Sequence, residues 1–198
     1  RQELAGALMD VERAIALAPT HISHYQLTLE PNTVFAANPP PLPDDDHAWA
    51  MQEACEARLA DAGYGQYEIS AYARPGRRCV HNLNYWQFGD YLGIGAGAHG
   101  KIGDAACNQI RRRWKSRHPR AYMDAAGSTT RIGGDSVIDR AELPFEYMLN
   151  ALRLIDGVPL HNFAERTGLP IASIDAKMAM AYQRGWLHDK PRPLHATR

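Results

Sequence analysis

The sequence predicts an α/β protein with two parts, an N-terminal part that alternates helices and strands and a C-terminal part that is mainly helical. Apolar residues recur at helical spacing over residues 4–18 and alternate over residues 21–29, and a second helix and strand follow. This alternation is typical of parallel strands joined by helices, so we expect the later part of a (β/α) barrel or of an open sheet. We therefore expect one domain over residues 1–115, a linker over 116–139, and a helical domain over 140–198.

The first helix is expected over residues 4–18, and Pro19 ends it. Residues 21–29 are expected to form a strand because Tyr25, Leu27 and Leu29 occupy alternate positions. Residues 31–43 contain five prolines. Proline lacks an N–H and fixes φ, so this segment is expected to be an extended loop.

A second helix is expected to begin at residues 44–46, which are three aspartates. Carboxylates at this position accept hydrogen bonds from free backbone N–H groups and complement the helix dipole. The helix should end near Ala62, with Gly63 as the residue that follows it. Residues 66–72 and 91–94 are expected to form two further strands.

The C-terminal part begins after residues 126–135, which have the composition of a linker. A helix is expected from Pro144 to Ile155, a short helix over 161–167, and a longer helix over 171–184. Residues 185–188 should then begin a strand or hairpin. This order resembles a winged-helix layout.

Composition restricts the class of protein. The chain has 198 residues, 22 basic and 22 acidic residues, and no net charge with histidine neutral. This argues against wholesale disorder and against attraction of the whole surface to nucleic acid. The sequence has no apolar run of 18 residues, and its first residues lack a secretory signal pattern. It begins directly in a helical pattern, so we interpret it as an internal part of a longer protein. Three widely spaced cysteines (Cys55, Cys79 and Cys107) suit a reducing compartment and a cytoplasmic location.

The segment 81–100 has the most unusual composition. It contains two histidines, two tyrosines, one tryptophan, one phenylalanine and five glycines. Glycines allow a close approach of the backbone to a ligand, aromatic rings supply a flat apolar wall, and a neutral imidazole binds haem iron. A flat macrocycle with one axial histidine would fit these residues. The alternative is a structural turn in which His81 and Asn82 bond to the local backbone.

Other candidate motifs are weaker. Residues 95–100 match GxGxxG, but a dinucleotide site needs a helix directly afterwards, and residues 101–104 indicate a turn. The basic run 111–117 could contact phosphates or porphyrin propionates, or could be a solvated face or a linker. Glu68 and Glu30 lie on or at the end of expected strands, where each could face either a functional interior or solvent.

Four ordered blocks carry a family resemblance, residues 25–33, 63–76, 81–86 and 91–100. The third block has the pattern HNxxYW. Together these blocks resemble the HemW family of radical-SAM haem chaperones, which belongs to the oxygen-independent coproporphyrinogen III oxidase-like proteins. The resemblance extends from residue 1 to about residue 190.

The resemblance implies the later part of a radical-SAM partial TIM-like barrel followed by a HemN-type C-terminal helical domain. The implied cofactors are haem and, in the full protein, a [4Fe–4S] cluster and S-adenosylmethionine. His81 is then the candidate axial ligand of the haem iron. The haem-binding candidates are His81, Asn82, Tyr85 and Trp86. The candidates near S-adenosylmethionine are Leu27, Ala98 and His99. No residue is assigned a catalytic role.

The implied partners are haem or a porphyrin and the respiratory proteins that accept haem, and no nucleic acid. The resemblance also allows peripheral contact with a membrane and a homodimer. The CxxxCxxC loop of the family is absent, so we expect this chain alone to lack radical chemistry. Two alternatives stay open, an oxygen-independent coproporphyrinogen III oxidase and a winged-helix binding module. In the second, the expected helix 171–184 carries only Lys177 and Arg184 as cations, which disfavours DNA binding.

Overall fold

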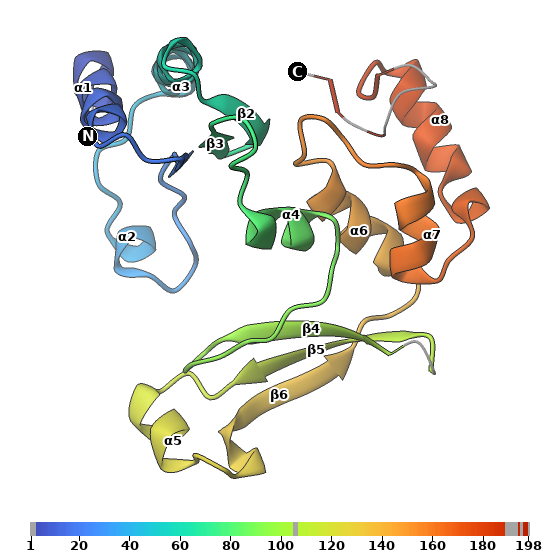
Figure 1. The fold of residues 1–198 in the computed structure, drawn as a ribbon. Coiled ribbons are helices and arrows are strands. Elements are labelled where there is room, and N and C mark those ends of the chain that lie inside the picture. The colour runs from blue at the N-terminus through green and yellow to red at the C-terminus, as the bar shows by residue number, and fades with distance from the viewer. Residues whose placement is uncertain (1–2, 105–106, 189–193, 195, 198) are drawn as a thin grey trace. The chain divides into compact units, whose positions relative to one another are not determined.

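The computed structural model describes residues 3–104, 107–188, 194 and 196–197. It divides into two compact units, residues 1–79 and 80–198 (Figure 1). Each unit has its own hydrophobic core. The division falls directly before the segment 81–100, and therefore differs from the boundary expected near residue 115.

The first unit consists of helices that pack beside a small sheet. Its elements are α1 (Leu4–Ala16), β1 (His21–Ser23), α2 (Val34–Ala37), α3 (Asp45–Asp61), β2 (Gly65–Glu68) and β3 (Ala71–Ala73). Ala7 and Val11 of α1 and Cys55 and Leu59 of α3 are buried together and form the centre of this core. The predicted helical spacing of apolar residues in α1 is thereby confirmed.

The sheet of the first unit differs from the expected parallel pairing. Its strand order is β1-β3-β2, and both pairings are antiparallel. The chain turns at Ile69 and Ser70, so the single strand expected over 66–72 is two strands. The strand expected over 21–29 ends at Ser23, because its partner β3 is only three residues long.

Two details of the expected helix boundaries are confirmed and one loop is corrected. The Asp44 carboxylate accepts a hydrogen bond from the His47 N–H at 2.9 Å, and α3 begins there. Gly63 follows the helix with a φ of +83°. The loop over 31–43 contains the short helix α2, because residues 34–37 lie between the prolines and Thr33 caps their N-terminus.

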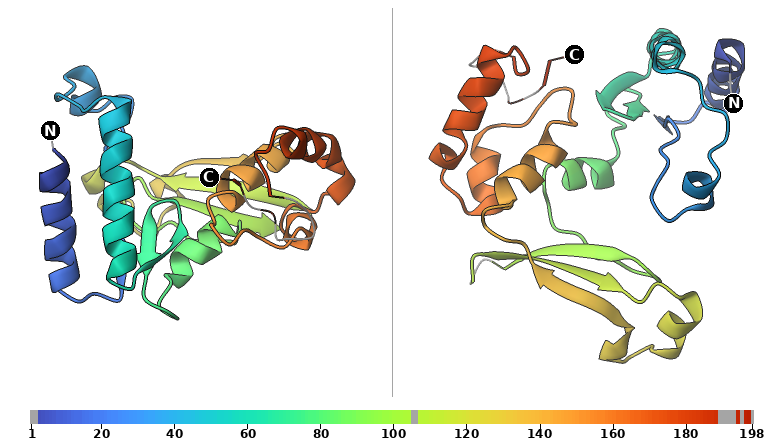
Figure 2. Two further views of the ribbon diagram at one scale, coloured as in Figure 1. Left: turned by 90° about the horizontal axis from the view of Figure 1, so that it is seen from above. Right: turned by 180° about the vertical axis from the view of Figure 1, so that it is seen from behind.

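The second unit joins a helix, an antiparallel sheet and a helical layer (Figures 1 and 2). Its elements are α4 (Val80–Trp86), β4 (His99–Asp104), β5 (Gln109–Lys115), α5 (Pro119–Asp124), η1 (Thr129–Arg131), β6 (Ile132–Val137), α6 (Leu143–Ala151), α7 (His161–Thr167), η2 (Ile171–Ser173) and α8 (Asp175–Gln183). The strand order is β4-β5-β6, and both pairings are antiparallel. Helices α4, α6 and α7 lie on one side of this sheet.

The linker expected over 116–139 is wrong, because this stretch contains α5, η1 and β6. Strand β6 pairs with β5, with Asp135 opposite Arg113. Gly133 and Gly134 suggested a linker, but Gly134 is a packing residue. A Cβ atom at Gly134 would lie 2.0 Å from the Trp114 ring. The strand expected over 91–94 is also wrong, since only Tyr91 forms a β-bridge there, to Lys101.

The helical layer follows the expected order with shorter elements. Helix α6 ends at Ala151 rather than near residue 155, and the helix expected over 171–184 is divided into η2 and α8. Helix α7 lies where it was expected. The expected strand or hairpin at 185–188 is reduced to a β-bridge between Leu187 and Ala196.

Aromatic rings form the centre of the second core. Tyr147 of α6 lies between Phe88 and Phe163, with ring centroids 5.7 Å and 5.3 Å away. All three side chains are almost fully buried. This core therefore links the segment that follows α4 to α6 and α7.

Candidate functional site

The four haem-binding candidates lie on one short helix. His81, Asn82, Tyr85 and Trp86 belong to α4, which has seven residues. Positions i, i+1, i+4 and i+5 lie on the same side of a helix, so the HNxxYW spacing gathers these side chains on one face. The sequence did not predict this helix, because asparagine, valine, histidine and aromatic residues have low helix propensity.

His81 presents a free imidazole at the start of this face. Its side chain is exposed, and it forms no hydrogen bond or ion pair with any residue that the structure describes. The backbone bond that the alternative expects for His81 is therefore not observed, whereas Asn82, the other residue of that alternative, does have a partner. An exposed imidazole nitrogen of this kind is accessible to a metal ion or a haem iron.

Trp86 forms an aromatic and cationic cluster with its neighbours. Its ring meets the Tyr85 ring edge to face at 4.9 Å, and the Arg153 guanidinium lies 4.2 Å from its ring centre. A cation over an indole ring is an attractive arrangement. The Trp86 Nε1–H is buried without a hydrogen-bond partner among the described residues. An unpaired buried donor of this kind is unfavourable and calls for an explanation, such as a ligand or a functional role.

Tyr85 is held by a second tyrosine that comes from the loop after α4. The rings of Tyr85 and Tyr91 lie 4.8 Å apart. Burial and the neighbouring Tyr85 phenol raise the pKa of Tyr91 far above its ordinary value. Tyr91 in turn pairs with Lys101 through two backbone hydrogen bonds of 2.9 Å. The face of α4 is therefore connected to the sheet.

Some glycines of segment 81–100 let the chain approach itself. A Cβ atom at Gly93 would lie 2.4 Å from the His99 carbonyl oxygen, and one at Gly100 would lie 2.9 Å from the Gly93 nitrogen. These glycines are explained by the fold, without a ligand. The GxGxxG match runs into strand β4 rather than into a helix, which agrees with its rejection as a dinucleotide site.

The candidates for S-adenosylmethionine lie in different units. Leu27 is exposed in the first unit, after the end of β1. Ala98 and His99 belong to the second unit, and the His99 imidazole stacks on Trp114 with ring centroids 6.0 Å apart. Their proposed role stays a prediction.

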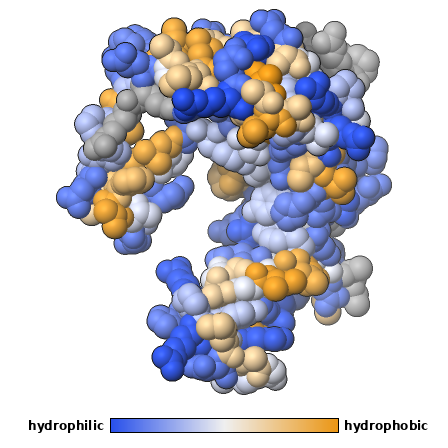
Figure 3. Space-filling model, turned by 60° about the vertical axis from the view of Figure 1, so that its left-hand side comes forward, coloured by the Kyte–Doolittle hydropathy of each residue, from blue (hydrophilic) through white to orange (hydrophobic). Residues whose placement is uncertain are grey.

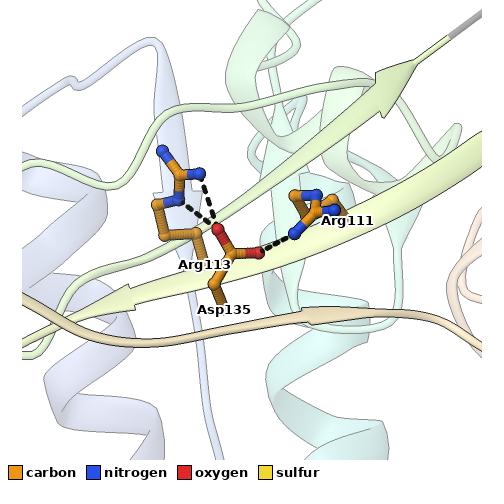
Figure 4. A network of polar contacts seen from close by, with 3 residues as sticks. All are labelled: Arg111, Arg113 and Asp135. Carbon is orange, nitrogen blue, oxygen red and sulfur yellow. Dashed lines mark hydrogen bonds and ion pairs between the residues drawn. The ribbon is translucent and has the colours of Figure 1, made fainter.

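The basic run is a strand rather than a linker. Arg111 and Arg113 project from the same side of β5 and share the carboxylate of Asp135 on β6 (Figure 4). The Asp135 oxygens accept from Arg111 at 2.7 Å and from the Nε of Arg113 at 2.8 Å. These two arginines lower the pKa of Asp135. Arg112 points to the opposite side and pairs with Glu146 at 2.5 Å. Carboxylates within the protein therefore neutralise part of this run.

The acidic candidates separate clearly. Glu68 is only 1% exposed and lies on β2, whereas Glu30 is exposed in the loop after β1.

The three cysteines are free thiols, Cys55 buried and Cys107 exposed. Among the described residues, no group of three or more His, Cys, Asp or Glu side chains could hold a metal ion.

Hydrophobic side chains are exposed on the part of the molecule that contains the sheet β4-β5-β6, low in the space-filling view (Figure 3). Leu92 and Ile94, in the loop between α4 and β4, are 77% and 85% exposed. Within the described ranges, each helix is too short or too polar to cross a lipid bilayer.

Two residues close to α4 were missed by the sequence analysis, Phe88 and Lys101. Phe88 follows the helix with a positive φ, and Lys101 lies beneath it with only 3% of its surface exposed. A lone lysine in a glycine-rich segment carries no signal of burial. Arg153, which covers Trp86, was also missed, because its distance from α4 in the sequence conceals the contact.

Comparison with known proteins identifies relatives over nearly the whole chain. Residues 138–198 match the family model described as "HemN C-terminal domain". The chain is 45% identical to "Heme chaperone HemW" of Escherichia coli over 186 residues, which are 94% of this chain and 48% of that protein. It is 44% identical to "Heme chaperone HemW" of Haemophilus influenzae over 94% of this chain and 47% of that protein.

A solved structure has the same fold. The coproporphyrinogen III oxidase HemN from Escherichia coli, described as a radical SAM enzyme, matches with a TM-score of 0.70 and 16% sequence identity. The match covers 99% of this chain and 48% of that one. The predicted fold class, α/β with a HemN C-terminal domain, is thereby confirmed. The chain spans about half the length of the curated relatives that it matches.

Proposed function

Because the chain belongs to the family of the HemW haem chaperones and spans about half the length of those relatives, we propose that its second unit contributes the haem-binding helix of such a chaperone. The full protein would be located in the cytoplasm and would deliver haem to respiratory proteins. The observation that carries this proposal is the face of α4, where a free imidazole lies beside two aromatic rings.

The residues of α4 fit a haem group. His81 offers an exposed nitrogen to the iron, and Tyr85 and Trp86 lie one turn further along the same face. The unpaired Trp86 Nε1–H is a donor available to a polar group of a ligand after a small movement of the ring. Arg153 over Trp86 adds a positive charge of the kind that attracts propionate groups.

The described residues do not fit an iron–sulfur cluster, since their three cysteines lie far apart in the sequence and none belongs to a cluster of ligands. Cluster and S-adenosylmethionine binding are therefore assigned to the full protein. Leu27, Ala98 and His99 stay candidates for contact with S-adenosylmethionine there.

A haem titration tests this proposal. We would add haemin to the chain and follow the Soret absorbance, using His81→Ala and His161→Ala. His161 is a matched control, because it is also exposed and begins α7, a helix of the same length. We expect saturable binding by the original chain and by His161→Ala, and binding at least tenfold weaker by His81→Ala.

Equal binding by the original chain and His81→Ala would contradict the role of His81. No binding by a chain that circular dichroism shows to be folded would contradict a haem site on α4 of this segment. To separate a chaperone from an oxidase, the full protein would be supplied with coproporphyrinogen III. Turnover to the decarboxylated product would contradict a function limited to haem delivery.

A further inference from the structure

Helix α4 ends in an unusual backbone conformation. The Gly89 N–H donates to the Asn84 carbonyl at 2.8 Å, and the Phe88 N–H donates to the Tyr85 carbonyl at 3.0 Å. This pair of bonds is the Schellman motif, which requires a left-handed residue after the helix. Glycine usually occupies that position, but here it is Phe88, with a φ of +59°. A bulky residue in this region is strained and needs support from its surroundings.

Lys101 supplies that support from strand β4. Its Nζ donates to the Phe88 carbonyl oxygen at 2.8 Å and lies 3.7 Å from the centre of the Phe88 ring. One ammonium group therefore contacts both the carbonyl and the ring of the strained residue. The lysine is 3% exposed and Phe88 is 1% exposed, so both contacts are protected from water.

Lys101 is also connected to α4 by a second route. Its backbone N–H and C=O both pair with Tyr91, whose ring lies 4.8 Å from the Tyr85 ring on the helix. The side chain of Lys101 therefore fixes the end of α4, and its backbone fixes the tyrosine that contacts the middle of the helix.

A methionine at this position would fill a similar volume without the cost of burying a charge. The charged groups around Lys101 come from several elements. They are Asp90 in the loop after α4, Arg112 on β5, Glu146 on α6 and Arg166 on α7. Since the amine bonds to a carbonyl rather than to a carboxylate, its role is tied to the backbone of Phe88.

We propose that Lys101 is a positioning residue for the haem site, which holds Phe88 in its left-handed conformation and thereby sets the orientation of Tyr85 and Trp86. The expected effect on haem binding rests on the proposed function, whereas the expected effect on α4 does not. Lys101 itself is too buried to contact the ligand.

The test compares Lys101→Met, Lys101→Arg and the control Lys115→Met on the neighbouring strand β5. Hydrogen exchange of the Gly89 amide reports on the end of α4, and haemin titration reports on the site. In Lys101→Met we expect Gly89 exchange to be at least tenfold faster and haemin affinity to be about tenfold lower. Lys101→Arg, which keeps a cationic donor, should recover part of both losses, and Lys115→Met should behave like the original chain.

Unchanged Gly89 exchange and haemin affinity in Lys101→Met would overturn the inference. Nuclear magnetic resonance of the original chain provides a measurement that does not depend on a variant. When the Lys101 amine is titrated, the Phe88 carbonyl carbon and the Trp86 indole N–H signals should shift with the same midpoint. A Trp86 signal whose chemical shift does not change in this titration would overturn the inference.

The two proposals can fail separately. Loss of Gly89 protection in Lys101→Met, in a chain that does not bind haemin, supports the positioning role and contradicts the haem site. Haemin binding that depends on His81 but is identical in Lys101→Met supports the haem site and contradicts the positioning role.

Discussion

Helices α4 and α7 are both seven residues long and carry an exposed histidine in their first turn, but they end differently. Helix α7 ends at Gly168, with a φ of +65° and a bond from its N–H to the Ala164 carbonyl at 2.9 Å. After α4 the left-handed residue is Phe88, with a φ of +59°. Glycine adopts this conformation without strain, whereas phenylalanine does not.

The difference indicates what each helix end does. Gly168 needs no support to end α7, and among the described residues its carbonyl receives one long contact, at 3.5 Å from the exposed Arg140. Phe88 needs a buried lysine at 2.8 Å. The Phe88 ring packs on Tyr147, and this contact joins the end of α4 to the hydrophobic core of the second unit. Strain and a buried charge are therefore concentrated beside the candidate site and are absent from the comparable helix.

The largest expected effect comes from removing the two core phenylalanines, Phe88 beside α4 and Phe163 within α7. Each change to alanine should lower the free energy of unfolding by about 3–5 kcal/mol. The glycine variants then distinguish the two positions. Phe88→Gly should be about 1 kcal/mol more stable than Phe88→Ala, because glycine relieves the left-handed strain, whereas Phe163→Gly should be about 1 kcal/mol less stable than Phe163→Ala.

Urea denaturation of the four variants measures these differences. If the glycine variant were less stable than the alanine variant at both positions, Phe88 would not be strained.

A smaller effect is expected from Gly168→Ala. This change places a Cβ atom on a left-handed residue, 2.1 Å from the Asn108 side-chain oxygen. It should lower the stability by about 1–2 kcal/mol. Asn108 also has a positive φ, so the double variant is compared with Asn108→Ala alone. That difference should lack the part due to the clash and keep the backbone strain at position 168, about 1 kcal/mol. Thermal denaturation can check both values, and a neutral Gly168→Ala would remove the contrast between the two helix ends.

The smallest effect is a change of stability with pH. Burial lowers the pKa of Lys101 to about 8, while the unfolded lysine titrates near 10.4. Above pH 8 the unfolded chain therefore binds more protons than the folded chain, and stability rises with pH. We expect a gain of roughly 1 kcal/mol between pH 8 and pH 9.

The gain should be absent in Lys101→Met. Burial raises the pKa of the Cys55 thiol, which makes stability fall over the same range, but this contribution is the same in both chains. The difference between their urea midpoints at pH 8 and pH 9 therefore isolates Lys101. If the stability of the original chain and of Lys101→Met changed with pH in parallel, the lysine would not be buried as a charge.

The sequence predicted the elements that have strong local signals. Helices α1, α3 and α7 were expected because apolar spacing, the aspartates before α3 and the glycine after α7 mark their bounds. The antiparallel sheet of the second unit was missed. On β5 the arginines alternate between Asp135 on one side and Glu146 on the other, so no contrast of apolar and polar residues marks the strand.

Only some residues of the candidate site carry a signal in the sequence, and the role of all of them stays a prediction. The residues of the HNxxYW block were found from their types and from a family resemblance, and the structure places all four on α4. Lys101, Tyr91 and Arg153 were not found in these roles, because each acts through a contact that depends on the fold. The glycines were found, but the structure explains Gly89, Gly93 and Gly100 by close approach of the chain to itself.

The contact between Lys101 and Phe88 has a consequence for the order of folding. The two residues are separated by 13 positions, whereas the Arg112–Glu146 pair that joins the sheet to α6 spans 34. Closing a short loop takes about 10–100 ns and loses less chain entropy than closing a long one. The hairpin-like unit of α4 and β4 can therefore form before the helical layer docks on it. Substitutions at Lys101 should then slow refolding more than substitutions at Glu146, which should mainly speed unfolding.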